Sequence, residues 1–173
     1  MGKNLIGAFY QPKLVLIDSA VLKTLPQREI RAGLAEVIKY GVIRDKKLFA
    51  FLEKNFSDIL NLGESIDYAV RRSCEIKADI AEKDETEKGL RAILNYGHTF
   101  GHAIESLTHY KEFRHGEAVA IGMVMAAGLS YKMGICSYNL YKRIRAVIEA
   151  FGLPALSPPE IDIDKITGKL KLI

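Results

Sequence analysis

Helical spacing of apolar residues dominates this chain and limits what it can fold into. Between residues 25 and 151, apolar side chains recur every three or four positions, with glycines and prolines between the segments. The one run with strand-like composition is Lys13–Asp18 (KLVLID), and a lone strand needs partners to satisfy its backbone hydrogen bonds. The sequence therefore predicts a mainly α fold, a helical bundle domain with a short N-terminal strand and hinge.

The chain, at 173 residues, is long enough for one domain with its own core. We expect the chain from residue 25 onward to form a helical domain, and the strand before it to belong to a sheet of another domain. Helices are predicted over about 26–41, 64–82, 90–105, 117–133 and 138–151, and a short helix with a loop over 48–62.

Composition and charge exclude several classes of partner. The net charge of +4 is mild, and basic residues alternate with acidic ones, so no nucleic-acid-binding stripe is present. The longest apolar run, Ala118–Leu129, is too short to span a bilayer, and no signal-peptide pattern opens the chain. Cys74, expected on an inward helix face, and Cys136 have no metal-type spacing and are predicted to be buried free thiols. We expect a cytoplasmic protein with neither a nucleic-acid nor a membrane partner.

The stretch LRAILNYGHTFGHAIE, residues 90–105, carries the densest set of polar candidates. His98 and His102 are four residues apart, so they share one face of the predicted helix. Asn95 and Arg91 stand about one and two turns before His98 in the same predicted helix. This stretch alone leaves two interpretations open, a metal or anion site and a pair of histidines that only make local hydrogen bonds.

One carboxylate and two imidazoles from separate helical segments, Glu36, His98 and His115, form a familiar ligand set for a catalytic divalent metal. Spacing alone would instead pair His98 with His102, with Glu105 or Glu36 as the third ligand. Zinc suits imidazole and carboxylate ligands, although the same set can hold iron. The sequence by itself does not choose between these sets.

Basic and amide side chains could contact an anionic ligand near such a metal. An arginine binds a carboxylate or phosphate with two hydrogen bonds, whereas a lysine acts as a point charge. Taken singly, such a basic or amide residue is more often a surface residue than a ligand contact. A glutamate and a lysine three positions apart, as Glu36 and Lys39 are, more often form a solvated ion pair. The candidates are Lys39, Lys77, Arg91 and Asn95.

Four ordered blocks of sequence resemble one known family. They are Gly2–Pro12 (GKNLIGAFYQP), Gly33–Gly41 (GLAEVIKYG), Lys77–Glu105 (KADIAEKDETEKGLRAILNYGHTFGHAIE) and His115–Met123 (HGEAVAIGM). These blocks look strongly like 3-dehydroquinate synthase of the shikimate pathway, and the match extends over nearly the whole chain. The part that they match is the helical C-terminal half of that enzyme, with the hinge that leads into it. The resemblance implies that residues 1–24 are a hinge and a strand remnant of an NAD-binding domain, and that residues 25–173 are a helical metal- and substrate-binding domain cut short at its C-terminal end.

The resemblance implies a homodimeric lyase that depends on NAD+ and on Zn2+ or Co2+. Its substrate would be an anionic sugar-acid phosphate, 3-deoxy-D-arabino-heptulosonate 7-phosphate, and its products 3-dehydroquinate and phosphate. By resemblance Glu36, His98 and His115 hold the metal, and His102 turns to the substrate. The other implied substrate contacts are Lys39, Lys77, Arg91, Asn95 and Asn4, and the implied dinucleotide contacts are Lys3, Leu22, Lys23 and Thr24.

The chain also departs from the family pattern. No GxGxxG or equivalent phosphate-binding loop occurs in it, and the family's glycine-rich nucleotide-binding domain does not precede Gly2. We therefore expect an enzyme fragment with weak NAD+ affinity and no complete turnover. The alternatives are another sugar-phosphate cyclase, such as 2-deoxy-scyllo-inosose synthase, and a non-catalytic helical dimerisation module.

Overall fold

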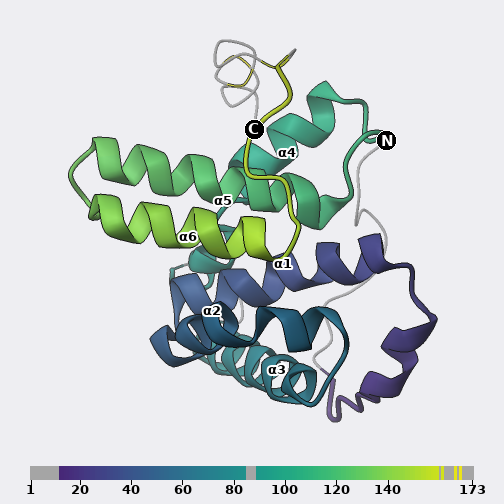
Figure 1. Cartoon of the computed structure of the whole chain (residues 1–173). Coiled ribbons are helices and arrows are strands. Elements are labelled where there is room, and N and C mark those ends of the chain that lie inside the picture. Colours follow the sequence, from purple (N-terminus) through teal and green to yellow (C-terminus); the bar gives the residue numbers. More distant parts are fainter. Residues whose placement is uncertain (1–11, 85–88, 160, 162–165, 167, 169–173) are drawn as a thin grey trace.

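The computed structural model describes residues 12–84, 89–159, 161, 166 and 168, and every regular element among them is helical (Figure 1). The prediction of a mainly α fold is therefore confirmed. No helix among these residues is both long enough and apolar enough to cross a membrane. The elements are the 3-10 helices η1 (Ser19–Thr24) and η2 (Leu90–Asn95) and the α-helices α1 (Gln27–Ile43), α2 (Lys46–Leu60), α3 (Ser65–Lys83), α4 (His98–Leu107), α5 (His115–Lys132) and α6 (Tyr138–Ala150).

The predicted strand at Lys13–Asp18 is wrong, because these residues form no regular element. Leu14 and Leu16 are 81% and 90% exposed, and no strand among the described residues lies beside them to complete a ladder. Asp18 instead caps η1, because its side chain accepts a hydrogen bond from the backbone N–H of Ala20 at 2.9 Å. Of the hinge and strand remnant predicted over residues 1–24, residues 1–11 lie outside the described residues.

Helix α1 is the central element of the bundle. It contacts α2 and α3 on one side and α5 and α6 on the other, so it lies between the two halves of the molecule (Figure 1). Its apolar stripe includes Ile30, Leu34 and Ile38, all of which are buried. The main core continues from this stripe into α2, α3, α5 and α6, and a second, smaller cluster lies between α4 and α5.

On α3 the inward position predicted for Cys74 is not observed. The buried stripe of this helix contains Ser73, whereas Cys74 is exposed. The buried hydroxyl of Ser73 donates to the backbone carbonyl of Ala69 at 2.7 Å, so it needs no solvent. The prediction of two buried thiols is therefore wrong for Cys74, and Cys136 is only half-buried.

The prediction of a single helix over residues 90–105 is also wrong, because the helix is interrupted at Tyr96 and Gly97, between η2 and α4. Gly97 stands at the break with φ of 81°, in the left-handed region. A β-carbon at Gly97 would lie 2.6 Å from Cγ of Met123 and 2.9 Å from the backbone oxygen of Val119. Arg91 and Asn95 therefore belong to η2 and do not share a helix with His98.

Two further glycines let α5 approach its neighbours backbone to backbone. A β-carbon at Gly116 would lie 1.9 Å from the carbonyl oxygen of Ala32 in α1. One at Gly122 would lie 2.0 Å from the carbonyl oxygen of Gly97, which precedes α4. No real side chain tolerates such distances, so these contacts require glycine, and they set the position of α5 against α1 and α4.

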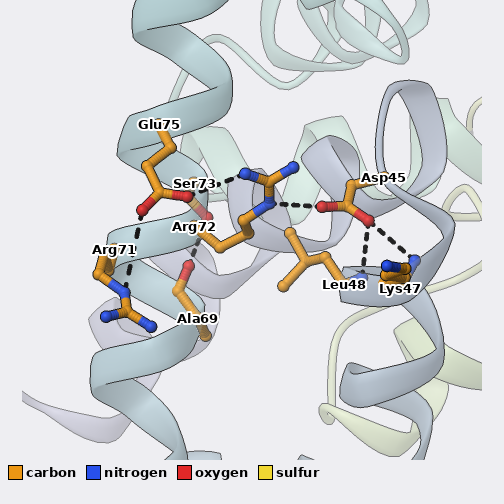
Figure 2. Close-up of polar contacts among 8 residues, drawn as sticks. All are labelled: Asp45, Lys47, Leu48, Ala69, Arg71, Arg72, Ser73 and Glu75. Atoms are coloured by element: carbon orange, nitrogen blue, oxygen red, sulfur yellow. Dashed lines mark hydrogen bonds and ion pairs between the residues drawn. The ribbon is translucent and has the colours of Figure 1, made fainter.

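Ion pairs connect the N-terminal cap of α2 to α3 (Figure 2). Asp45 caps α2 by accepting hydrogen bonds from the N–H groups of Lys47 and Leu48, and it also accepts one from Arg72 of α3 at 2.5 Å. Arg72 also contacts Glu75 at 2.9 Å. Although burial opposes the effect, the hydrogen bonds from Arg72 and the backbone hold the pKa of Asp45 below its ordinary value.

Replacing Gly116 or Gly122 with alanine should lower the free energy of unfolding by about 1–3 kcal/mol, because the new methyl group meets a backbone carbonyl. Gly33 of α1 is the matched control, since a β-carbon added there would meet nothing within 4 Å. Gly33→Ala should stabilise the protein by up to about 1 kcal/mol through helix propensity. Urea unfolding of the three variants measures the difference, and equal effects at all three positions would contradict the proposed close approach.

Replacing Asp45 with alanine should lower the free energy of unfolding by about 1–2 kcal/mol at pH 7, because α2 loses its N-terminal cap and Arg72 loses a partner. Because the pKa of Asp45 is lowered in the folded state, its contribution is present above the unfolded pKa of about 4 and is lost as the pH falls through the folded pKa. The free energies of unfolding of wild type and of Asp45→Asn, measured at several pH values, should therefore converge in acid. Glu82→Ala, at an exposed position, is the control. A difference in the free energy of unfolding between wild type and Asp45→Asn that stays constant with pH would contradict the lowered pKa of Asp45.

Candidate metal and substrate site

Three helices bring one carboxylate and two imidazoles together. Glu36 comes from the middle of α1, His98 is the first residue of α4, and His115 is the first residue of α5. The Nε2 atoms of His98 and His115 lie 3.5 Å and 4.0 Å from Oε1 of Glu36. One ligand atom from each of the three residues lies within 4.8 Å of the others. Two ligands of a tetrahedral zinc ion are about 3.4 Å apart, so the three atoms are close to coordination geometry.

The carboxylate of Glu36 has one satisfied and one unsatisfied oxygen. Oε2 accepts a hydrogen bond from the ammonium of Lys39 at 2.6 Å, and that lysine side chain is only 4% exposed. Oε1 is buried and has no hydrogen-bond partner among the described residues. A buried oxygen without a partner is costly, and an ion bound between it and the two Nε2 atoms would supply the missing interaction. The residues present therefore fit a divalent metal.

Both histidines are oriented through their second ring nitrogen. Nδ1 of His98 lies 3.3 Å from the backbone carbonyl of Tyr96, and Nδ1 of His115 lies 3.3 Å from the carboxylate of Glu105. Such contacts place the ring proton on Nδ1 and leave the lone pair of Nε2 free, as in histidines that bind metals. Burial, followed by the nearby Lys39 ammonium, lowers the pKa of His98, which also favours the neutral imidazole.

His102 lies beside this group but is exposed. Its ring centroid is 5.6 Å from that of His98 and 5.8 Å from that of His115. It forms a second possible ligand group with Glu105 and His115, in which Glu105 is buried. The grouping expected from spacing alone, His98 with His102, is therefore split between two sets, while the set implied by the resemblance lies together in space.

Ion pairs between α1 and the start of α5 hold this corner in place. Arg28 of α1 makes two hydrogen bonds of 2.7 Å to the carboxylate of Glu117 and one to the backbone carbonyl of Glu112. Glu117 also accepts from the backbone N–H of Arg114, whose guanidinium pairs with Glu29 at 2.7 Å. Sequence reasoning missed these residues, because Arg28 and Glu117 are 89 positions apart and no local pattern links them.

The other predicted substrate contacts lie on α3 and in η2. Lys77 is exposed on α3, Arg91 is half-buried in η2, and its backbone N–H donates to Asp84. Asn95 is exposed and lines a shallow hollow that also contains Tyr96 and Thr99.

The positions expected to touch the dinucleotide, Leu22, Lys23 and Thr24, form the end of η1, and Leu22 packs against the main core. Lys3 and Asn4 lie outside the described residues. The substrate and dinucleotide roles of all these residues stay predictions.

Comparison with family models matches the chain twice. The model described as "3-dehydroquinate synthase C-terminal" matches residues 33–172, and the model described as "3-dehydroquinate synthase N-terminal" matches residues 1–32. Curated relatives with the name 3-dehydroquinate synthase include one from Shewanella loihica, 50% identical over 100% of this chain and 52% of its own length. Another, from Desulforamulus reducens, is 58% identical over 99% of this chain and 51% of its own length.

Solved structures of related cyclases have the same fold. The 2-epi-5-epi-valiolone synthase of Streptomyces hygroscopicus, solved with NAD+ and Zn2+ bound, gives a TM-score of 0.87 at 28% identity over 98% of this chain and 47% of that one. A 2-deoxy-scyllo-inosose synthase, complexed with carbaglucose-6-phosphate, NAD+ and Co2+, gives a TM-score of 0.78 at 30% identity over 98% and 46%. This chain belongs to the 3-dehydroquinate synthase family and spans about half the length of the curated relatives that it matches.

Proposed function

We propose that this chain is the metal- and substrate-binding half of a 3-dehydroquinate synthase. The reaction is the conversion of 3-deoxy-D-arabino-heptulosonate 7-phosphate to 3-dehydroquinate and phosphate, with NAD+ as cofactor. The single observation that carries the proposal is the buried, unpartnered Oε1 of Glu36, which faces Nε2 of His98 and Nε2 of His115 in a chain of this family.

The metal is proposed to be held by Glu36, His98 and His115. Zinc is the first candidate and cobalt the second, which is supported by the Zn2+ and Co2+ ions in the two related cyclase structures. A bound divalent ion would hold substrate hydroxyls and polarise the one that is oxidised. The ammonium of the buried Lys39 pairs with Oε2 of Glu36 and leaves Oε1 available to an ion.

The remaining residues are proposed to orient the substrate. The exposed imidazole of His102 stands beside the metal group, where it can donate or accept a hydrogen bond with a hydroxyl. Lys77, Arg91 and Asn95 are proposed to hold carboxylate, phosphate and hydroxyl groups, and Arg91 offers two-point binding of an oxyanion. Holding a flexible seven-carbon substrate in one geometry lowers the entropic part of the barrier for each later step.

NAD+ is proposed to be bound mainly by the half of the relatives' length that this chain does not span. Lys3, Leu22, Lys23 and Thr24 would add contacts at the junction, which is supported by the exposure of Lys23 and Thr24 at the end of η1. The exposed apolar residues before η1, Leu14 and Leu16, are consistent with a junction that another domain covers. A homodimer in the cytoplasm completes the proposal.

Two alternatives are less well supported. Other sugar-phosphate cyclases share the fold, but they are 28% and 30% identical to this chain, whereas the curated 3-dehydroquinate synthases reach 50% and 59%. A non-catalytic dimerisation module would have no use for an unpartnered carboxylate oxygen that faces two oriented imidazoles.

Metal binding by the purified chain tests the proposed site directly. Wild type should hold one zinc ion, and His98→Ala and His115→Ala should each abolish tight binding, because each removes one of three ligands. His109, exposed on the loop after α4 with φ of 55°, provides the control, since His109→Asn keeps that backbone conformation and should not change metal content. Zinc retained by both alanine variants would show that the ligands lie elsewhere.

Turnover tests the proposed reaction. Joined to the first half of a curated relative, the chain should release phosphate from 3-deoxy-D-arabino-heptulosonate 7-phosphate in the presence of NAD+ and zinc. It should not act on sugar phosphates that lack the carboxylate, because the basic residues proposed to hold that group would lack their partner. The same fusion with His98→Ala is the control. Preference for a substrate without the carboxylate would favour one of the other cyclases.

A further inference from the structure

Glu105 is a buried carboxylate that the proposed function does not use. It lies on α4 with its side chain only 5% exposed. Its two oxygens lie 3.3 Å and 3.4 Å from Nδ1 of His115, and no other hydrogen bond to this carboxylate occurs among the described residues. Burying a carboxylate costs free energy unless the group is paired. The single contact of Glu105 with His115 therefore calls for an explanation.

His115 is the most exposed of the three proposed ligands. Its side chain is 42% exposed, compared with 15% for His98 and 33% for Glu36. The neighbouring protein therefore restrains its ring less than the ring of His98. His98 has a backbone carbonyl, that of Tyr96, as its hydrogen-bond partner, whereas the partner of His115 is the side chain of Glu105.

We propose that Glu105 is a positioning residue whose carboxylate accepts the Nδ1–H of His115 and thereby presents Nε2 of His115 to the metal. The arrangement rests on the proposed function, since it gives the carboxylate a role in metal affinity. Accepting this proton selects one tautomer and restricts rotation of an exposed ring. Glu105 does not itself touch the ion in this arrangement.

The competing explanation is that Glu105 is itself a ligand. Glu105, His102 and His115 also offer three ligand atoms within 4.8 Å of one another. In that case His115 would use Nδ1 for a second ion, and Glu105 would no longer orient it. The two explanations differ in the number of ions bound and in the tautomer of His115 in the metal-free protein.

The first measurement is zinc affinity by chelator competition at a fixed pH near 8. Glu105→Gln, which keeps the shape but loses the charge, should weaken binding by about 10-fold, and Glu105→Ala by up to about 100-fold. Glu112→Gln is the matched control, because this exposed glutamate lies three residues before His115 and its carboxylate makes no contact with the cluster among the described residues. Its affinity should equal that of wild type, and thermal unfolding of each variant checks that the fold is kept.

The second measurement does not need metal. In the metal-free chain with 15N-labelled histidine, His115 should carry its proton on Nδ1, and Glu105→Ala should move it toward the Nε2–H form. His115→Ala identifies the signals. Unchanged affinity together with an unchanged tautomer in Glu105→Ala would overturn the inference, as would two zinc ions per wild-type chain with one lost in Glu105→Gln. If wild type binds no zinc, the proposed metal site fails, and the tautomer comparison still decides the role of Glu105.

Discussion

The close backbone contacts of α5 determine where the functional side chains lie. Gly116 meets the carbonyl of Ala32 in α1, and Gly122 meets the carbonyl of Gly97 at the start of α4. Two of these three glycines adjoin proposed ligands along the chain, since Gly97 precedes His98 and Gly116 follows His115. Glu36 stands one helical turn after Ala32 on α1, on the same side of the helix. Any added methyl group would push the helices apart and separate the three ligands, so packing and function depend on the same contacts.

Each proposed ligand also has a partner that leaves one atom free for the ion. Lys39 occupies Oε2 of Glu36, the carbonyl of Tyr96 occupies Nδ1 of His98, and Glu105 occupies Nδ1 of His115. Oε1 and the two Nε2 atoms then face one another without further partners among the described residues. A set of polar groups arranged only for stability would pair these atoms with each other or with solvent. The arrangement fits the proposed metal site, in which the ligands would be oriented before an ion binds.

The sequence predicted the helices well, because their apolar periodicity and their glycine and proline boundaries are local signals. Predictions from the sequence were wrong where contacts between distant parts of the chain determine the local structure. The break at Gly97 depends on its contact with Met123, the register of α3 admits Ser73 because a backbone carbonyl satisfies its hydroxyl, and the strand predicted at Lys13–Asp18 has no neighbour among the described residues. Spacing favoured His102 beside His98, since residues four apart share a helix face. Only the approach of α5, which no local pattern encodes, brings His115 to Glu36, so the resemblance to a family was needed to select this ligand set.

The proposed metal site is tested most directly by anomalous diffraction at the zinc edge from crystals of the metal-loaded chain. We expect one strong peak within about 2.0–2.2 Å of Nε2 of His98, Nε2 of His115 and Oε1 of Glu36. Nδ1 of His115 should remain in contact with Glu105 in the same crystals. A peak between His102, Glu105 and His115, or no ordered peak at all, would contradict the proposed site.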